Sequence, residues 1–294
     1  MASGYMKKST LVTASWVVVP PFRHDLAWRA AVVSAAEAAG RHVYDIDATP
    51  EVAPVGDPDA VLLTSDAFRP VQAGAPAEAV AGLMIEPSIR INPDEDPESL
   101  PQDIRLLTDL MGRMAALPPE RIFRRRDFIS GAVEILPKLT LSPPPTVHAP
   151  ALPPRHQALT NAVALLDPAS PEAIWAPELF NYNSRMGAGG GELDITGRPR
   201  CLLSGPYIVL PAGRWRATYK LKFDQRGSRA RFRVDWGGVE DFLSEAFVPG
   251  RAGVFEIIQE YTWLTPSPAE VRVILLEGMF DGQMVFSGAE ISRV

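Results

Sequence analysis

The sequence predicts a two-domain protein, in which a parallel α/β domain precedes an antiparallel β-sandwich. Three observations support this. The first half alternates between strand and helix signals, residues 137–156 are rich in proline, and the second half contains short strands with alternating polar and apolar side chains. Strand–helix–strand repeats are typical of parallel sheets, whereas successive alternating strands without helices are typical of sandwiches. The predicted boundaries are 6–136, a linker at 137–156, and 157–294.

The first domain begins with a buried strand. Residues 10–19 (TLVTASWVVV) lack polar alternation, as expected for a strand covered on both faces. An alanine-rich helix is predicted from Asp25 to the glycine at position 40, which is a typical residue to end a helix. Strands are predicted at 42–47 and 60–66, so the order is that of a βαβ unit.

A second long helix is predicted after Ser99, which pairs with Gln102 as a capping box. Apolar residues then recur at helical spacing until Pro118. Residues 120–136 are predicted to be helical, with a break near Gly131. The segment from 137 is too rich in proline to continue a helix or to enter a central strand, so it is interpreted as a semi-rigid linker.

The second domain shows clean alternation. In residues 214–223 (RWRATYKLKF) the side chains of Trp215, Tyr219 and Phe223 lie on the same side as two smaller apolar ones. Residues 230–236 repeat the pattern, and three further strands are predicted before the C-terminus. Alternation of this kind predicts sheets with one buried and one solvated face.

The overall composition excludes several classes of protein. The 294 residues carry a net charge of −6, which does not indicate nucleic-acid binding. No window is long and apolar enough for a membrane span, and the N-terminal apolar run lacks a small-x-small cleavage site. The single cysteine, Cys201, excludes an intrachain disulfide, so a cytoplasmic location is expected.

A glycine-rich stretch, FNYNSRMGAGGGELDITGRPR at 180–200, resembles a phosphate-binding loop at first sight. Glu192 occupies the place of the third glycine in a dinucleotide fingerprint, and no lysine follows as a P-loop requires. Strands are predicted to follow, so no helix N-terminus would receive an anion. The stretch is therefore interpreted as a turn at the entrance to the sandwich.

Two pairs of carboxylates are candidates for a sugar-nucleotide or metal site. Asp45 and Asp47 end the second strand, where an acidic residue can hold a ribose hydroxyl, or simply face solvent. Asp94 and Asp96 form a D-x-D pair that could hold a divalent cation, although acidic residues before a helix also favour its N-terminus. The four histidines show no zinc-site spacing, and no catalytic residue, metal site or cofactor is predicted. The arginines at 121 and 124–126 form a basic cluster that could bind a phosphate or carboxylate, but it is interpreted as a solvated surface.

A carbohydrate site is predicted beside the glycine-rich turn. An aromatic ring next to polar groups suits the C–H face of a sugar, although packing at the edge of the core is the alternative. The predicted residues combine rings with amides and charges around this turn: Trp175, Asn181, Tyr182, Asn183, Arg185, Asp194, Arg198 and Trp236.

Four motifs in the second half carry a resemblance to a known group of proteins. They are T-G-R-P-R at 196–200, G-P-Y at 205–207, L-P-x-G-R-W-R at 210–216 and L-L-E-G-x-F-x-G at 275–282. This region, about 115 residues long, resembles a carbohydrate-binding-like β-sandwich associated with bacterial exopolysaccharide glycosyltransferases. The resemblance implies a jelly-roll or carbohydrate-binding-module-like fold. The first half resembles part of a Rossmann-like or glycosyltransferase-like domain, without a recognisable donor-binding region.

We therefore expect a non-catalytic accessory protein that binds a polysaccharide, or a partner enzyme such as a glycosyltransferase, during surface polysaccharide production. Two alternatives stay open. One is a small glycosyltransferase-like enzyme that uses a sugar nucleotide, and the other is a structural protein whose sandwich forms a homo-oligomer without binding a glycan.

Overall fold

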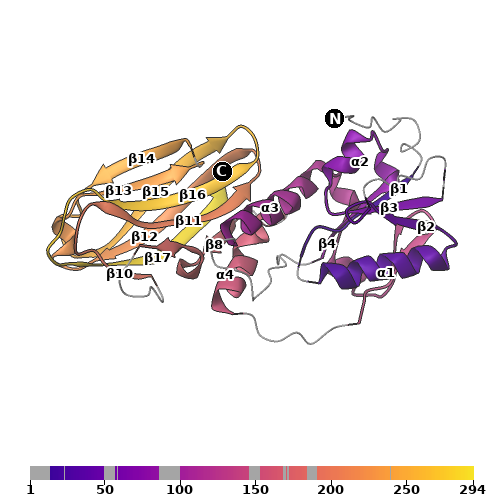
Figure 1. The fold of residues 1–294 in the computed structure, drawn as a ribbon, viewed down its shortest axis with the longest axis horizontal. Coiled ribbons are helices and arrows are strands. Elements are labelled where there is room, and N and C mark those ends of the chain that lie inside the picture. The colour runs from indigo at the N-terminus through magenta and orange to yellow at the C-terminus, as the bar shows by residue number, and fades with distance from the viewer. Residues whose placement is uncertain are drawn as a thin grey trace. The chain divides into compact units, whose positions relative to one another are not determined.

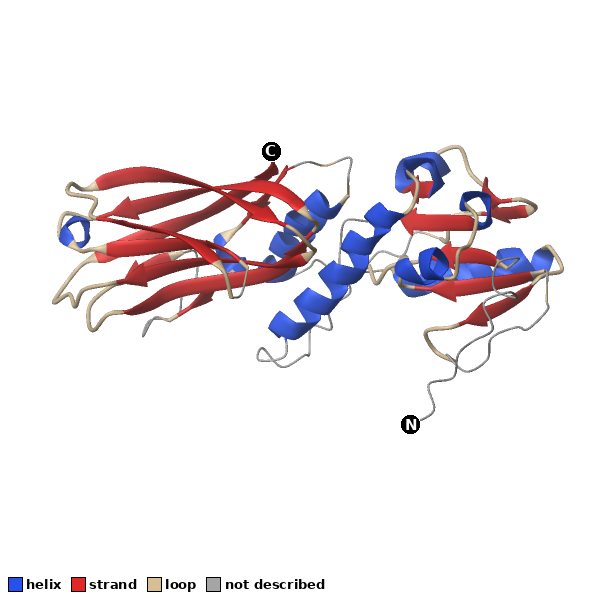
Figure 2. Ribbon diagram, turned by 90° about the horizontal axis from the view of Figure 1, so that it is seen from above, coloured by secondary structure: helices blue, strands red, loops and turns tan. Residues whose placement is uncertain are grey.

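The computed structural model describes residues 14–22, 24–49, 57, 59–85, 100–145, 153–167, 170, 172–183, 191–238 and 240–294. The chain forms two compact units. The first comprises Met1–Arg90 and Arg113–Pro150, and the second comprises Ile91–Gly112 and Ala151–Val294. Each unit has its own sheets, which are drawn in Figures 1 and 2.

The first unit contains a five-stranded parallel sheet with the order β2-β3-β1-β4-β5. Its strands are β1 (Ser15–Val18), β2 (His42–Asp45), β3 (Ala60–Thr64), β4 (Val80–Met84) and β5 (Ile122–Arg124). All residues of β3 are buried, as its predicted apolar run implies, and all residues of β4, which was not predicted, are buried as well. The parallel α/β prediction is confirmed.

Helices cover this sheet. Helix α1 (Asp25–Ala38) places Trp28, Val32 and Ala36 at helical spacing against the sheet, and all three are buried. It ends as predicted, because the glycine at position 40 adopts a φ of 69°. Helix α2 (Phe68–Gln72) follows β3. On β4, Gly82 leaves room for Met114, since a Cβ there would lie 2.6 Å from the Met114 Cε.

The segment predicted as a helix at 120–136 is not helical. It contains β5, a short 3₁₀ turn at Arg125–Phe128, and β6 (Val133–Leu136), which forms a hairpin with β7 (Leu139–Leu141). The predicted linker therefore begins with an ordered strand, in which Leu139 and Leu141 are fully buried. Lys138 makes the tight turn with a φ of 63°, and its backbone N–H donates to Glu134 Oε1 at 2.8 Å.

Helix α3 (Leu100–Gly112) lies in the second unit rather than in the α/β domain where the sequence placed it. Thr108 contributes one of the contacts between this helix and the sandwich. Its buried hydroxyl accepts a 2.9 Å hydrogen bond from the backbone N–H of Val209 in β11 (Arg200–Leu210) and donates to the Ile104 carbonyl. The helix thus satisfies a backbone donor of the sandwich.

The second unit is a two-sheet antiparallel β-sandwich, which confirms that prediction (Figure 2). One sheet has the order β10-β17-β12-β15, with β8 paired to β17, and the other has the order β14-β13-β16-β11-β9. The remaining bounds are β8 (Glu172–Trp175), β9 (Asn181–Tyr182), β10 (Glu192–Asp194), β12 (Gly213–Phe223), β13 (Phe232–Gly237), β14 (Phe242–Phe247), β15 (Gly253–Trp263), β16 (Ser267–Leu275) and β17 (Gln283–Arg293). Helix α4 (Pro154–Ala162) contacts β8.

The sandwich core contains the residues that alternation assigned to it. Trp215, Tyr219 and Phe223 of β12 are each no more than 1% exposed. The two sheets meet through aromatic rings, since Trp236 of β13 contacts Trp175 of β8 and Trp263 of β15 with centroid distances of 5.7 and 5.0 Å. Edge-to-face pairs of this kind stabilise a core beyond their buried area.

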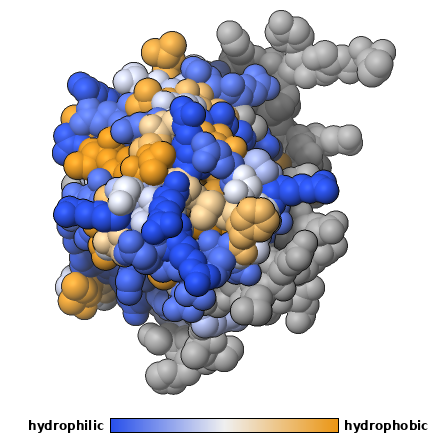
Figure 3. All heavy atoms as spheres, turned by 90° about the vertical axis from the view of Figure 1, so that its left-hand side faces the viewer, coloured by the Kyte–Doolittle hydropathy of each residue, from blue (hydrophilic) through white to orange (hydrophobic). Residues whose placement is uncertain are grey.

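Short turns close the sandwich at the end that Figure 3 shows, where apolar and polar side chains are mixed on the surface. The 3₁₀ turn Gly227–Arg229 lies at this end, and the backbone N–H of Gly250 donates to the Ser228 carbonyl. Among the helices of the described residues, none is long and apolar enough to cross a membrane.

Candidate functional site

A row of polar side chains crosses the outward face of the sheet β14-β13-β16-β11-β9. The strand registers place one member on each strand, with Asn181 opposite Ser204, Ser204 opposite Arg272, Arg272 opposite Asp235, and Asp235 opposite Ser244. Directly opposed residues share a face of a sheet. The alternate residues of β13 and β16 point into the core, so this row points away from it.

Two carboxylates are buried on this face. Asp235 and Glu270 are each 1% exposed, although their strands direct them outward. Arg233 lies 2.8 Å from Asp235 Oδ1, and the Ser244 hydroxyl donates to the same oxygen at 2.7 Å. Buried charges require partners of this kind, so the two acids form a fixed part of the surface rather than mobile side chains.

Arg272 joins the row to the carboxylate of Glu270. Its Nη2 donates to Glu270 Oε2 at 2.6 Å, and this hydrogen bond raises the pKa of the guanidinium. The guanidinium carbon also lies 4.1 Å from the centre of the Phe242 ring. Stacking on an aromatic face fixes the plane of an arginine, so its remaining N–H groups have a defined direction.

Tyr207 is the second residue that donates a hydrogen bond to Glu270, and its backbone conformation is strained. Its φ is 68°, which is uncommon for a bulky residue. The register of β11 against β16 shifts between Pro206 and Ile208, and Tyr207 lies at this irregularity. Its hydroxyl donates to Glu270 Oε1 at 2.9 Å, and burial raises its pKa, with a further contribution from the Glu270 charge. Strained residues often occur at functional sites.

A groove of about 510 Å³ lies in the same unit. Val209 and Pro268, which are paired between β11 and β16, line it, and Pro268 lies two residues from Glu270 on β16. The groove is lined by Arg105, Leu106, Asp109, Val209, Pro266 and Pro268. We call the polar row, its buried carboxylates, Tyr207 and Phe242 the polar face.

The prediction that two of the tryptophans belong to the carbohydrate site is wrong. Trp175 and Trp236 are both fully buried, and their rings pack against each other between the sheets. Strand positions near loops suggested exposed rings. However, the two sheets close over them, so neither ring offers a face to a ligand.

Asn181 and Asp194, which were also predicted for the site, lie on edge strands of the two sheets. Asn181 is exposed on β9 and belongs to the polar row, while Asp194 is exposed on β10 of the opposite sheet. Arg200 connects part of this set, because its guanidinium donates to the backbone carbonyls of Asn183, Asp194 and Arg198 at 3.4, 3.0 and 3.2 Å.

Tyr182 is half-buried and its hydroxyl donates to the Pro177 carbonyl at 2.8 Å. Burial raises the pKa of this phenol, with the Glu178 charge as a second cause. Arg185 lies outside the described residues. Within the glycine-rich stretch, Gly191 has a φ of 78°, and a Cβ there would lie 2.1 Å from the Phe286 carbonyl oxygen. This glycine therefore serves close backbone packing.

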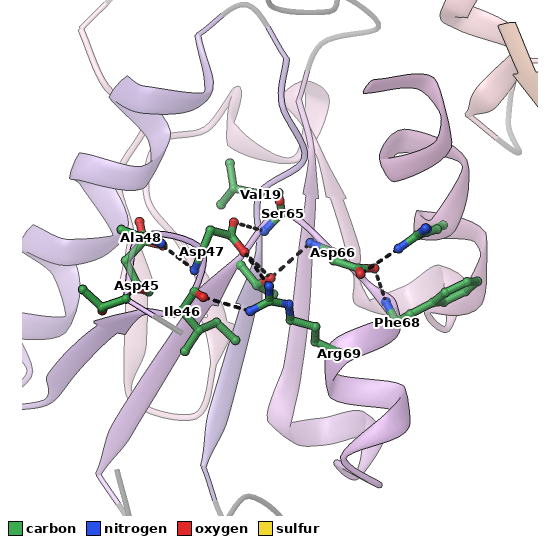
Figure 4. Close-up of polar contacts among 12 residues, drawn as sticks. Val19, Asp45, Ile46, Asp47, Ala48, Ser65, Asp66, Phe68 and Arg69 are labelled. Atoms are coloured by element: carbon green, nitrogen blue, oxygen red, sulfur yellow. Dashed lines mark hydrogen bonds and ion pairs between the residues drawn. The ribbon is translucent and has the colours of Figure 1, made fainter. Parts of the chain in front are cut away.

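Asp45 and Asp47 are held by hydrogen bonds and ion pairs within the α/β unit (Figure 4). Asp47 accepts hydrogen bonds from the Thr64 hydroxyl at 2.9 Å, the Ser65 backbone at 2.6 Å and Arg29 at 2.7 Å. Arg29 also donates to Asp45 Oδ2 at 2.9 Å. Burial raises the pKa of Asp47, but the hydrogen bonds from Arg29, Ser65 and Thr64 outweigh it, so the net shift is downward.

These contacts occupy the oxygens that a ribose would need. Asp45 Oδ1 accepts hydrogen bonds from the backbone N–H groups of Asp47 and Ala48, and Asp45 Oδ2 accepts one from Arg29. Asp94 and Asp96 lie outside the described residues. Within the part of the chain that the structure describes, no group of three or more His, Cys, Asp or Glu side chains is placed to hold a metal ion.

Sequence reasoning missed most of the polar face. Alternation placed Asp235 on the solvated side of its strand, but its pairing with Arg272 and Ser244 depends on strand registers that come from distant segments. The G-P-Y motif was the one local signal, because it contains Tyr207.

No protein-family model matches the chain, and no curated protein matches it. Among solved structures, it is similar to the module TmCBM61 in complex with β-1,4-galactotriose, with 12% identity and a TM-score of 0.29 over 44% of this chain and 85% of that one. It is also similar to the CBM36-1 domain of a multidomain xylanase from the hindgut metagenome of Trinervitermes trinervoides, with 12% identity and a TM-score of 0.29 over 42% and 98% of the two chains.

A third similar structure is the C-terminal CBM6 of LamC, a marine laminarinase from Zobellia galactanivorans. The identity is 16% and the TM-score is 0.26, over 39% of this chain and 88% of that one. Similarity at these identities and TM-scores carries no argument about what this chain binds.

Proposed function

We propose that the β-sandwich binds a glycan on the polar face, and that the protein is a glycan-binding or scaffolding accessory protein of bacterial surface polysaccharide biosynthesis. The observation that carries the proposal is the polar row, Asn181–Ser204–Arg272–Asp235–Ser244, which crosses all five strands. Four strand spacings give a row about 19 Å long, which suits an oligosaccharide rather than a single ring.

The chemistry of the face matches that of a sugar chain. Sugar hydroxyls both donate and accept hydrogen bonds, and the exposed and half-buried members of the row supply amide, hydroxyl and guanidinium groups. Phe242 adds an apolar ring beside Arg272, as C–H faces of sugars require. The buried carboxylate of Glu270 holds Arg272 and Tyr207 in place before a ligand arrives, which lowers the entropic cost of binding.

The accessory role, a cytoplasmic location and a glycosyltransferase partner rest on the motifs that resemble exopolysaccharide proteins and on the single cysteine. The contacts of Asp45 and Asp47 with Arg29 favour this non-catalytic reading over a sugar-nucleotide enzyme that uses these residues. A homo-oligomer stays a prediction, which light scattering on the full chain would test.

The proposal is tested by titrating the full chain with neutral and acidic bacterial polysaccharides in a calorimeter. Asn181→Ala and Arg272→Lys remove hydrogen bonds from the row, and each should weaken binding by about 2–10-fold. Thr218→Ala and Lys220→Ala are matched controls, since they lie on the outward face of the opposite sheet.

The control variants should bind as the unmodified protein does. Two results would reject the proposal. One is the absence of binding to every polysaccharide, and the other is a loss of affinity in the controls but not in the variants of the row.

A further inference from the structure

A separate cavity of about 310 Å³ lies in the α/β unit, at the carboxyl ends of its parallel strands. His24 follows β1, Ile85 follows β4, and Arg125 follows β5, and all three line the cavity. From β1 the chain continues to β2, toward one edge of the sheet, whereas from β4 it continues to β5, at the opposite edge. The cavity therefore lies where the direction of strand addition reverses, which is where open α/β sheets bind ligands.

Part of the wall of the cavity is apolar. Trp28 and Phe128 form its aromatic part, with an edge-to-face contact at a centroid distance of 4.9 Å. Ala27 and Ile129 contribute exposed or half-exposed apolar surface beside three consecutive prolines at 143–145. A volume above about 300 Å³ with such walls is typical of small-molecule sites. The surfaces suit a flat ring rather than a polyol.

The polar groups of the cavity are basic. Its lining contains the imidazole of His24 and the exposed guanidinium of Arg125, and no acidic side chain is among the described residues that line it. This contrasts with a chain whose net charge is −6. A cavity with a guanidinium and no carboxylate favours a ligand with a negative charge.

The mode of binding differs from that of a dinucleotide fold. The stretch from the end of β1 to the start of α1 (residues 17–25, VVVPPFRHD) has no glycine, so the backbone cannot closely approach a pyrophosphate. The anion would be held by side chains. The residues that line the cavity are also distinct from Asp45, Asp47 and their partners.

We infer that this cavity binds a small molecule that carries one planar ring and one anionic group. A nucleoside monophosphate and an aryl carboxylate share this chemistry. Uridine 5′-monophosphate, adenosine 5′-monophosphate and indole-3-acetate are the probes. Uridine, inorganic phosphate and indole are the matched compounds that each lack one of the two features.

The experiment is a calorimetric titration of the full chain with each probe. At least one ring-bearing anion should bind, and the compounds that lack the ring or the charge should bind at least 10-fold more weakly. Arg125→Ala should reduce affinity by about 10-fold or more, because it removes a charge-assisted hydrogen bond. Arg126→Ala is the control, since Arg126 is exposed on the same turn and does not line the cavity.

A second variant distinguishes occupancy of the cavity from attraction to surface charge. Ala27→Phe fills the cavity and should abolish binding, while Ala30→Phe adds the same ring to an exposed position of α1 and should not. The inference is overturned if no probe binds, if Arg125→Ala and Arg126→Ala have equal effects, or if Ala27→Phe binds as the unmodified chain does. Because these readouts do not involve the sandwich, they are independent of polysaccharide binding.

Discussion

The hydroxyl of Tyr207 donates a 2.9 Å hydrogen bond to Oε1 of Glu270, and this contact joins a residue with a φ of 68° to a carboxylate that is 1% exposed. The partners lie on β11 and β16, which are paired over their whole length. Arg272 holds the other oxygen of Glu270. The contact therefore stabilises the polar face and the irregular part of β11 together.

Removing this hydroxyl should destabilise the sandwich. Tyr207→Phe leaves a buried carboxylate oxygen without its donor, at a cost of about 1–3 kcal/mol in the free energy of unfolding. Urea unfolding followed by tryptophan fluorescence measures it. Tyr261→Phe is the control, because the hydroxyl of Tyr261 donates to the exposed Asp241. Equal stabilities of the two variants would contradict a special role for Tyr207.

Thr108 should anchor α3 to the sandwich. Thr108→Val keeps the shape of the side chain but removes the acceptor of the Val209 N–H, so we expect a loss of about 1–3 kcal/mol. Faster hydrogen exchange at the Val209 amide would report the change locally. Thr160→Val is the matched control, since the Thr160 hydroxyl donates only within its own helix. Unchanged exchange at Val209 would show that the contact does not anchor the helix.

Lowering the pH should destabilise the α/β unit, because it protonates the carboxylate of Asp47. The folded-state pKa of Asp47 is below its ordinary value, so the stability it contributes is present above that ordinary value and is lost as pH falls through the folded pKa. Hydrogen exchange at the Ser65 amide, measured between about pH 6 and pH 3, follows this loss after correction for the intrinsic rate. Asp47→Asn should remove that part of the pH dependence, whereas the exposed Glu37→Gln on α1 should retain it.

Trp236 should act on folding and not directly on a ligand. Trp236→Ala removes a fully buried ring that contacts Trp175 and Trp263, so we expect a loss of about 3–5 kcal/mol. Phe280→Ala is the control because Phe280 is fully exposed, and its effect should stay within about 0.5 kcal/mol. Normal thermal stability of Trp236→Ala would contradict the placement of this ring in the core.

Local patterns in the sequence were enough for the class of each unit. The unbroken apolar runs of β1 and β3 and the glycine after α1 predicted the parallel unit, because burial on both faces and helix termination are local properties. The alternation in β12 predicted which of its side chains enter the sandwich core.

Only the tertiary structure decided the rest. The helicity of α3 is local, but its place on the sandwich depends on contacts with β11, among them the hydrogen bond between Thr108 and Val209, which are far apart in the chain. The burial of Trp175 and Trp236 depends on two sheets closing over them. The polar row exists because the registers of five strands bring Asn181, Arg272 and Ser244 into line, and a register is set by pairing between distant segments that no local pattern encodes.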